Sequence, residues 1–156
     1  MGFCVEKRDG STDVESRRMS WVEVETPTKE SFPVSTSDSE PRLATRSESI
    51  LVDDFRQWLT ANGLESSSAL YYVHDSTLRS DLFIRDWNLL VEAKANSNRG
   101  SIRTAIGQLF DYRRFHNPEP KIAILVPREP ERDLLELLHG LEIEVWFRDG
   151  DRFVSS

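Results

Sequence analysis

Apolar residues recur at helical spacing in three segments of this 156-residue chain. The first segment runs from about Arg46 to Ala61, and Asn62-Gly63 directly after it is typical of a helix C-terminus. The second runs from Ser101 to Phe115, and the third runs from Glu131 to His139 and is ended by Gly140. The apolar stripes of the first two consist of Leu51, Phe55, Trp58 and Leu59, and of Ile102, Ala105, Ile106 and Leu109.

Five shorter runs of apolar residues are typical of β-strands. They cover Leu70–Val73, Asp81–Ile84, Leu89–Lys94, Ile122–Val126 and Ile143–Phe147. Asp86-Trp87-Asn88 predicts a turn between the second and the third. The run from Ile122 to Val126 is apolar throughout, which indicates a strand buried on both faces. The resulting order, α-β-β-β-α-β-α-β, predicts an α/β fold with a mixed central sheet.

Residues 1–46 differ from the rest because Ser, Thr, Glu, Asp and Pro dominate them. We interpret this segment as a flexible tail or linker and residues 47–156 as the folded domain. Trp21–Glu25 alternates apolar and acidic residues and could form a short strand within the tail.

Composition indicates a soluble protein, because 30% of the residues are charged and 38% are hydrophobic. No apolar run approaches the roughly 20 residues that span a bilayer, and Cys4 is the only cysteine. We therefore expect a cytoplasmic protein that does not bind membranes. The net charge of −7 argues against a broad surface for nucleic acid.

Four arginines nevertheless gather on the second helix and beside it, namely Arg99, Arg103, Arg113 and Arg114, and only Asp111 opposes them there. Such a local basic patch can hold phosphate groups on an otherwise acidic protein. The alternative is an ordinary solvated helix face.

Glu92 and Lys94 end the apolar strand Leu89–Lys94, and residues two apart in a strand point to the same face. Two charges beside a core are costly unless they pair with each other, a metal or a substrate. Asp81 opens the preceding strand, so the turn between the strands brings Asp81 near Glu92. Two carboxylates beside a lysine suit a hard divalent cation and phosphodiester hydrolysis. The alternatives are a simple ion pair or surface residues of an edge hairpin.

Asp81 followed by Glu92-Ala93-Lys94 resembles the D…(D/E)xK signature of the PD-(D/E)XK nuclease superfamily. Gln108 and Tyr112 match the QxxxY motif of several of its branches, and Ser80 replaces the proline that often precedes the aspartate. The runs LVEAK and AIGQLFDYRRF are similar to nuclease-like domains at the C-termini of some bacterial restriction-type proteins. The resemblance implies a restriction endonuclease-like, three-layer α-β-α core.

The resemblance also implies a nuclease that hydrolyses DNA with Mg²⁺ or Mn²⁺, in restriction, defence or DNA repair. Asp81 and Glu92 would bind the metal, Glu48 would assist as a further ligand, and Lys94 would activate water. The substrate-binding residues would be Gln108, Tyr112, Arg103 and Arg114.

Several alternatives remain open. Glu48 also fits a capping box with Thr45 as N-cap, and Tyr112 could be an ordinary half-buried side chain with Gln108 as a polar neighbour. The chain could instead be a non-catalytic nucleic-acid-binding or assembly module that keeps the nuclease fold, or an unrelated α/β fold. A nuclease of this kind would work as a homodimer or with a separate recognition protein.

Overall fold

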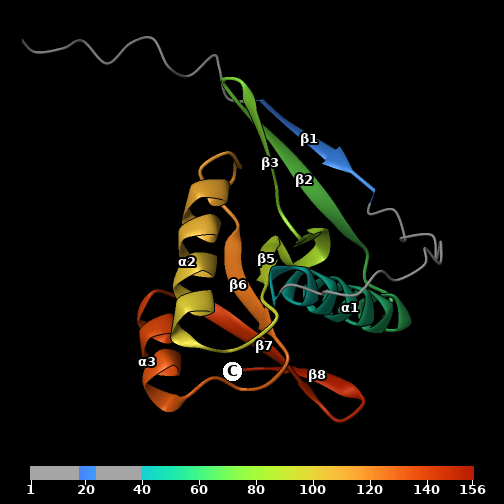
Figure 1. The fold of residues 1–156 in the computed structure, drawn as a ribbon. Coiled ribbons are helices and arrows are strands. Elements are labelled where there is room, and N and C mark those ends of the chain that lie inside the picture. The colour runs from blue at the N-terminus through green and yellow to red at the C-terminus, as the bar shows by residue number, and fades with distance from the viewer. Residues whose placement is uncertain (1–17, 24–39) are drawn as a thin grey trace, which may run out of the picture.

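The computed structural model describes residues 18–23 and 40–156, which form an α/β fold with an eight-stranded mixed sheet (Figure 1). The helices are α1 (Glu40–Ala61), α2 (Arg99–Arg113) and α3 (Arg132–Gly140). The strands are β1 (Arg18–Val22), β2 (Ser66–Val73), β3 (Ser76–Arg79), β4 (Leu82–Ile84), β5 (Leu89–Ala93), β6 (Lys121–Val126), β7 (Ile143–Asp149) and β8 (Arg152–Ser155).

The middle of the sheet is parallel and its flanks are antiparallel. The strand order is β1-β2-β4-β5-β6-β7-β8, and β3 pairs with β2. Strands β5, β6 and β7 run parallel because α2 and α3 provide the crossovers between them. Strand β4 pairs with β5 as an antiparallel neighbour, with Leu82 opposite Val91. The start of β4 therefore lies next to the end of β5, which is where the predicted site residues fall.

Helices cover both faces of the sheet, as Figure 1 shows. Leu89, Val91 and Ala93 of β5 pack into the cluster that contains the apolar stripe of α1. Leu90 lies in the other cluster, which contains the apolar residues of α2 and α3. Because side chains alternate along a strand, Glu92 shares the face of Leu90.

The structure confirms the α/β class and the three predicted helices, but it adds strands to the predicted order. Strand β3 escaped prediction because Leu78 is its only apolar residue, and β8 because it has only Phe153 and Val154. The turn before β8 consists of Gly150, in the left-handed region (φ 61°), and Asp151, so Gly150-Asp151 was the hairpin signal. The restriction endonuclease-like topology stays a prediction.

The N-terminal segment contributes two elements in its described part. β1 pairs antiparallel with β2, and α1 begins at Glu40. Thr45 therefore lies inside a helix, which excludes the alternative that it is the N-cap of a capping box with Glu48. Of the predicted strand Trp21–Glu25, Trp21 and Val22 lie in β1, and residues 24 and 25 lie outside the described residues. Cys4 also lies outside the described residues. The division into a tail and a domain stays a prediction.

None of the helices in the described ranges is long and apolar enough to cross a membrane.

The predicted stop of the third helix is displaced by two residues. Gly140 is helical, and Glu142 takes the left-handed conformation instead (φ 57°). A side chain there costs about 1–2 kcal/mol, which a glycine avoids at a smaller entropic cost. We expect Glu142→Gly to raise the free energy of unfolding by about 0.5–1 kcal/mol, as measured by urea denaturation. Glu136→Gly, in the middle of α3, should lower it by about 1 kcal/mol, and a loss of stability in both variants would contradict the expectation.

Candidate active site

A buried ion pair lies at the carboxyl end of β5. Glu92 is 3% exposed and Lys94, directly after the strand, is 8% exposed. The Lys94 ammonium donates a hydrogen bond to Glu92 Oε1 at 3.1 Å. The backbone N–H of Lys94 donates to the carbonyl of Leu125 in β6, which anchors the chain where the strand ends. The two charges therefore lie together, as their spacing in the strand predicts.

Asp81 reaches the same place from the neighbouring strand. It lies directly before β4, and its Oδ2 accepts a hydrogen bond from the backbone N–H of Ala93 at 2.7 Å. The hydroxyl of Ser68 in β2 donates to the carbonyl oxygen of Asp81 at 2.9 Å. Asp81 is thus fixed through its side chain to β5 and through its backbone to β2.

Glu48 approaches from α1. Its Oε1 lies 3.9 Å from the Lys94 ammonium nitrogen, and its carboxyl accepts a hydrogen bond from the Ala95 backbone. Glu48 precedes Leu51 by three residues and Phe55 by seven, so it continues the apolar stripe of α1 toward the sheet. Two carboxylates, of Glu48 and Glu92, therefore contact Lys94, and the carboxylate of Asp81 is close enough to feel its charge.

Burial makes this cluster electrostatically unbalanced. Desolvation, followed by repulsion from Asp81, raises the pKa of Glu92 from 4.5 to about 8, although the nearby Lys94 ammonium lowers it. Desolvation likewise raises the pKa of Asp81 and of Glu48. Glu92 Oε2 is buried and has no hydrogen-bond partner among the residues that the structure describes. An additional positive charge at this position would relieve both the repulsion and the unpaired oxygen.

A divalent cation fits the donor set here. Oxygen ligands are those that Mg²⁺ prefers, and it is usually held by one or two carboxylates while water and substrate phosphates supply the other ligands. Asp81 and Glu92 provide such a pair. In the described ranges no three His, Cys, Asp or Glu side chains gather as a complete metal cage. The arrangement suits an ion that takes part of its coordination from a bound substrate.

Tyr112 and Gln108 lie on α2, which packs on the face of the sheet that carries Glu92. Tyr112 is 6% exposed and stacks on Tyr71 with ring centroids 5.0 Å apart. Desolvation raises the pKa of Tyr112, and so does the negative charge of Glu92, while a hydrogen bond from Gln108 lowers it. This geometry favours packing against the carboxylates over exposure to solvent. Contact of either residue with a DNA phosphate stays a prediction.

The predicted basic patch is mostly neutralised by carboxylates. Three of its arginines form ion pairs, Arg99 with Asp133, Arg113 with Glu119 and Arg114 with Asp111. Arg103 is exposed and forms no ion pair with a described residue. Neither Arg103 nor Arg114 contacts the buried carboxylates. Arg103 is thus the member of the patch that offers its full charge to a ligand.

A buried polar network that supports Asp81 escaped the sequence analysis. The Ser80 hydroxyl accepts a hydrogen bond from the Ala69 backbone N–H at 3.0 Å. Burial raises the pKa of Tyr71 to about 12, and a hydrogen bond with Ser80 offsets part of that rise. The Tyr71 hydroxyl is in turn 2.8 Å from His116 Nε2. Ser80 is fully buried, and its only sequence signal was its position before Asp81, where many relatives of the predicted family have proline.

Comparison with known proteins does not identify a family. No protein-family model, curated protein or solved structure matches the chain. The resemblance to PD-(D/E)XK nucleases therefore rests on the residues quoted above.

Proposed function

We propose that this protein is a divalent-metal-dependent nuclease that hydrolyses phosphodiester bonds of DNA. The observation that carries the proposal is the unpaired, buried Glu92 Oε2 beside Asp81 and Lys94. A carboxylate pair with excess negative charge and an adjacent ammonium combines a cation site with a proton-handling group. These are the parts that metal-assisted phosphodiester hydrolysis needs.

Each residue of the cluster has a distinct role in this proposal. Asp81 and Glu92 hold Mg²⁺ or Mn²⁺, which, when bound, supplies Lewis-acid stabilisation of the charge that develops on the phosphate. The Lys94 ammonium lies between Glu92 and Glu48, where it orients the attacking water and stabilises developing negative charge. Glu48 positions Lys94 and serves as a further ligand. The hydrogen bond from Ala93 holds Asp81 in place.

The proposed DNA contacts on this chain are few. Gln108, Tyr112, Arg103 and Arg114 are the proposed substrate-binding residues, of which Arg103 is the unpaired cation. A second copy of the chain or a separate recognition protein would supply further contacts. The proposed setting is the cytoplasm, in restriction, defence or DNA repair, and the active-site core would be of the restriction endonuclease-like type.

Incubation with plasmid DNA and with a single-stranded DNA circle tests the proposal. We expect cleavage of at least one substrate with Mg²⁺ or Mn²⁺ and none with EDTA, because the metal would supply the Lewis-acid stabilisation that hydrolysis needs. Gel electrophoresis detects nicked or linear products. If both substrates stay intact in Mg²⁺ and in Mn²⁺, the proposed nuclease activity is contradicted. If cleavage is equally fast with EDTA, the proposed dependence on a metal is contradicted.

A non-catalytic module that keeps this fold is the second candidate. The three arginine–carboxylate pairs near α2 favour it, because they leave little free positive charge for DNA. This candidate predicts DNA or protein binding without cleavage, and binding that Lys94→Ala leaves unchanged.

A further inference from the structure

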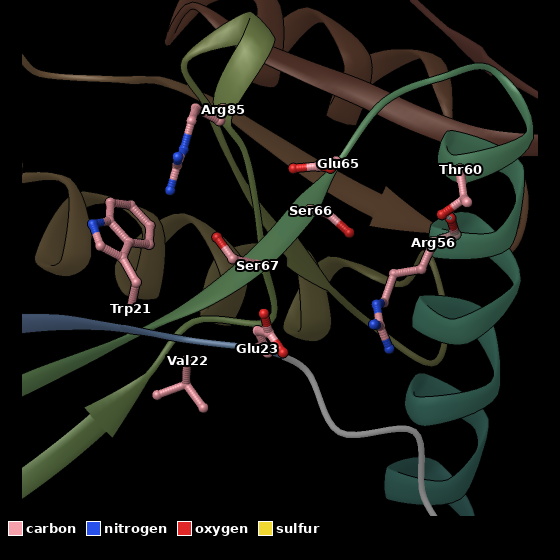
Figure 2. Close-up of a pocket in the computed structure, with 9 residues that line it drawn as sticks. All are labelled: Trp21, Val22, Glu23, Arg56, Thr60, Glu65, Ser66, Ser67 and Arg85. Carbon is pink, nitrogen blue, oxygen red and sulfur yellow. Dashed lines mark hydrogen bonds between the residues drawn. The ribbon is translucent and has the colours of Figure 1, made fainter.

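A pocket of about 590 Å³ opens at the start of β2, at the opposite end of β4 from Asp81. Figure 2 shows its walls, which come from the end of β1, the start of β2, the C-terminal half of α1 and the residue directly after β4. None of the proposed catalytic residues lines it. Its volume lies in the range of pockets that take small organic ligands.

Trp21 gives the pocket an aromatic surface. The side chain is 42% exposed, and its ring packs 4.7 Å from the ring of Phe83 and 5.7 Å from that of His116. Phe83 and His116 are both buried. The indole is therefore braced by the core while much of its surface stays open, and such a ring is a stacking platform for a flat aromatic ligand.

Polar side chains without a partner among the described residues line the pocket. Arg85 is exposed, and its side chain forms no ion pair or hydrogen bond with another described residue. The hydroxyls of Ser66 and Ser67 likewise have no hydrogen bond within the described ranges. Figure 2 shows Trp21, Ser67 and Arg85 around one side of β2, while Ser66 points to the side of α1. These donors and acceptors are available to a ligand.

The charges of the lining distinguish between ligands. The lining contains Arg85 and Arg56, of which Arg56 lies 3.6 Å from the Asp53 carboxylate, together with the carboxylates of Glu23 and Glu65. A pocket for a bare phosphate would have net positive charge. Balanced donors and acceptors beside an aromatic ring suit instead the edge of a nucleobase, which presents both kinds of group.

The pocket lies in line with the carboxylate site. Asp81 directly precedes β4, Phe83 lies within it and Arg85 directly follows it. Asp81 and Phe83 are two residues apart and share a face, and Arg85 begins the short 3-10 helix that follows β4, so the path from Asp81 to Arg85 covers about 13 Å. We propose that this pocket binds one unstacked nucleobase of the DNA strand, stacked on Trp21 and hydrogen-bonded by Arg85, Ser67 and Glu65. This inference rests on the proposed nuclease function.

Equilibrium binding of a short fluorescein-labelled single-stranded oligodeoxynucleotide in EDTA tests the subsite apart from cleavage. Trp21→Ala is expected to weaken binding about 5- to 100-fold, as for the loss of one stacked base, while Trp21→Phe keeps most of the affinity. Arg85→Ala should also weaken binding. Arg152→Ala is the matched control, because Arg152 is an exposed arginine on β8 at the opposite edge of the sheet.

A strand of the same length made of abasic nucleotides distinguishes the loss of base stacking from damage to the fold in Trp21→Ala. This strand has no base to stack, so it should bind equally to the wild type and to Trp21→Ala. An equal loss on the abasic strand would overturn the subsite, as would wild-type affinity in both Trp21→Ala and Arg85→Ala. Absence of strand binding by the wild type, or a free mononucleotide that binds as tightly as the strand, would overturn it too. Normal strand binding with DNA left uncut in Mg²⁺ would instead count against the proposed nuclease alone.

Discussion

Replacing Lys94 with alanine is expected to slow metal-dependent DNA cleavage by about 10²- to 10⁴-fold, the usual contribution of a positioned acid–base group. Lys94 is the ammonium that contacts both Glu92 and Glu48, so the substitution removes the group proposed to orient water and stabilise charge. The initial rate of plasmid nicking in Mg²⁺ measures the effect.

The fold should survive this substitution near neutral pH. The pKa of Glu92 is already raised to about 8, so Glu92 can bind a proton when its ammonium partner is removed. Circular dichroism checks the fold, and Lys94→Met, which retains the aliphatic stem, should be as inactive as Lys94→Ala. Lys121→Ala is the control, because Lys121 is an exposed lysine on β6 whose nearest carboxylate is Glu144. Cleavage at the wild-type rate by both Lys94 variants would contradict the role of Lys94.

Raising the pH from about 5 to about 8 in the absence of divalent cations is expected to lower the free energy of unfolding by about 3–5 kcal/mol through Glu92. The pKa of Glu92 is about 8 in the folded protein and 4.5 in an unperturbed chain. Between these values the unfolded chain releases the proton while the folded protein keeps it, so rising pH favours unfolding. The raised pKa values of Asp81 and Glu48 act in the same direction.

Urea denaturation at several pH values measures this slope, and Glu92→Gln serves as the comparison. Burial lowers the pKa of His116, which produces the opposite slope below about pH 6.5, but His116 is present in both proteins and cancels in the difference. Glu92→Gln should remove most of the loss of stability at high pH. An identical pH profile in the two proteins would show that Glu92 is not the buried acid responsible.

The buried elements were predictable from the sequence because their apolar spacing records which face packs on the core. The stripe containing Leu51, Phe55 and Leu59 is buried as predicted, and so is the run from Ile122 to Val126. β3 and β8 directly follow their partner strands, β2 and β7, along the chain, and most of their side chains are exposed or half-buried. Their pairing is set by turns and by backbone hydrogen bonds, which leave little trace in hydropathy.

The positions of the site residues followed from local rules, whereas their surroundings did not. The two-residue spacing of Glu92 and Lys94 and the hairpin to Asp81 predicted that these groups meet. The ion pair between Arg99 and Asp133 joins α2 to α3, and such pairs are set by tertiary packing. The basic patch was therefore overestimated, and the buried hydrogen bond between Tyr71 and His116 was missed for the same reason.

One measurement tests most directly whether the carboxylate pair works as a metal-dependent catalytic site. It compares the rates of plasmid cleavage in Mg²⁺ or Mn²⁺ by the wild type, Asp81→Ala and Asp86→Ala. Asp86 is an exposed acid in the turn between β4 and β5, so it controls for loss of charge. The wild type and Asp86→Ala should cleave at similar rates, and Asp81→Ala should lose at least about 100-fold. Cleavage by Asp81→Ala at the wild-type rate would contradict a metal-dependent nuclease site at Asp81 and Glu92.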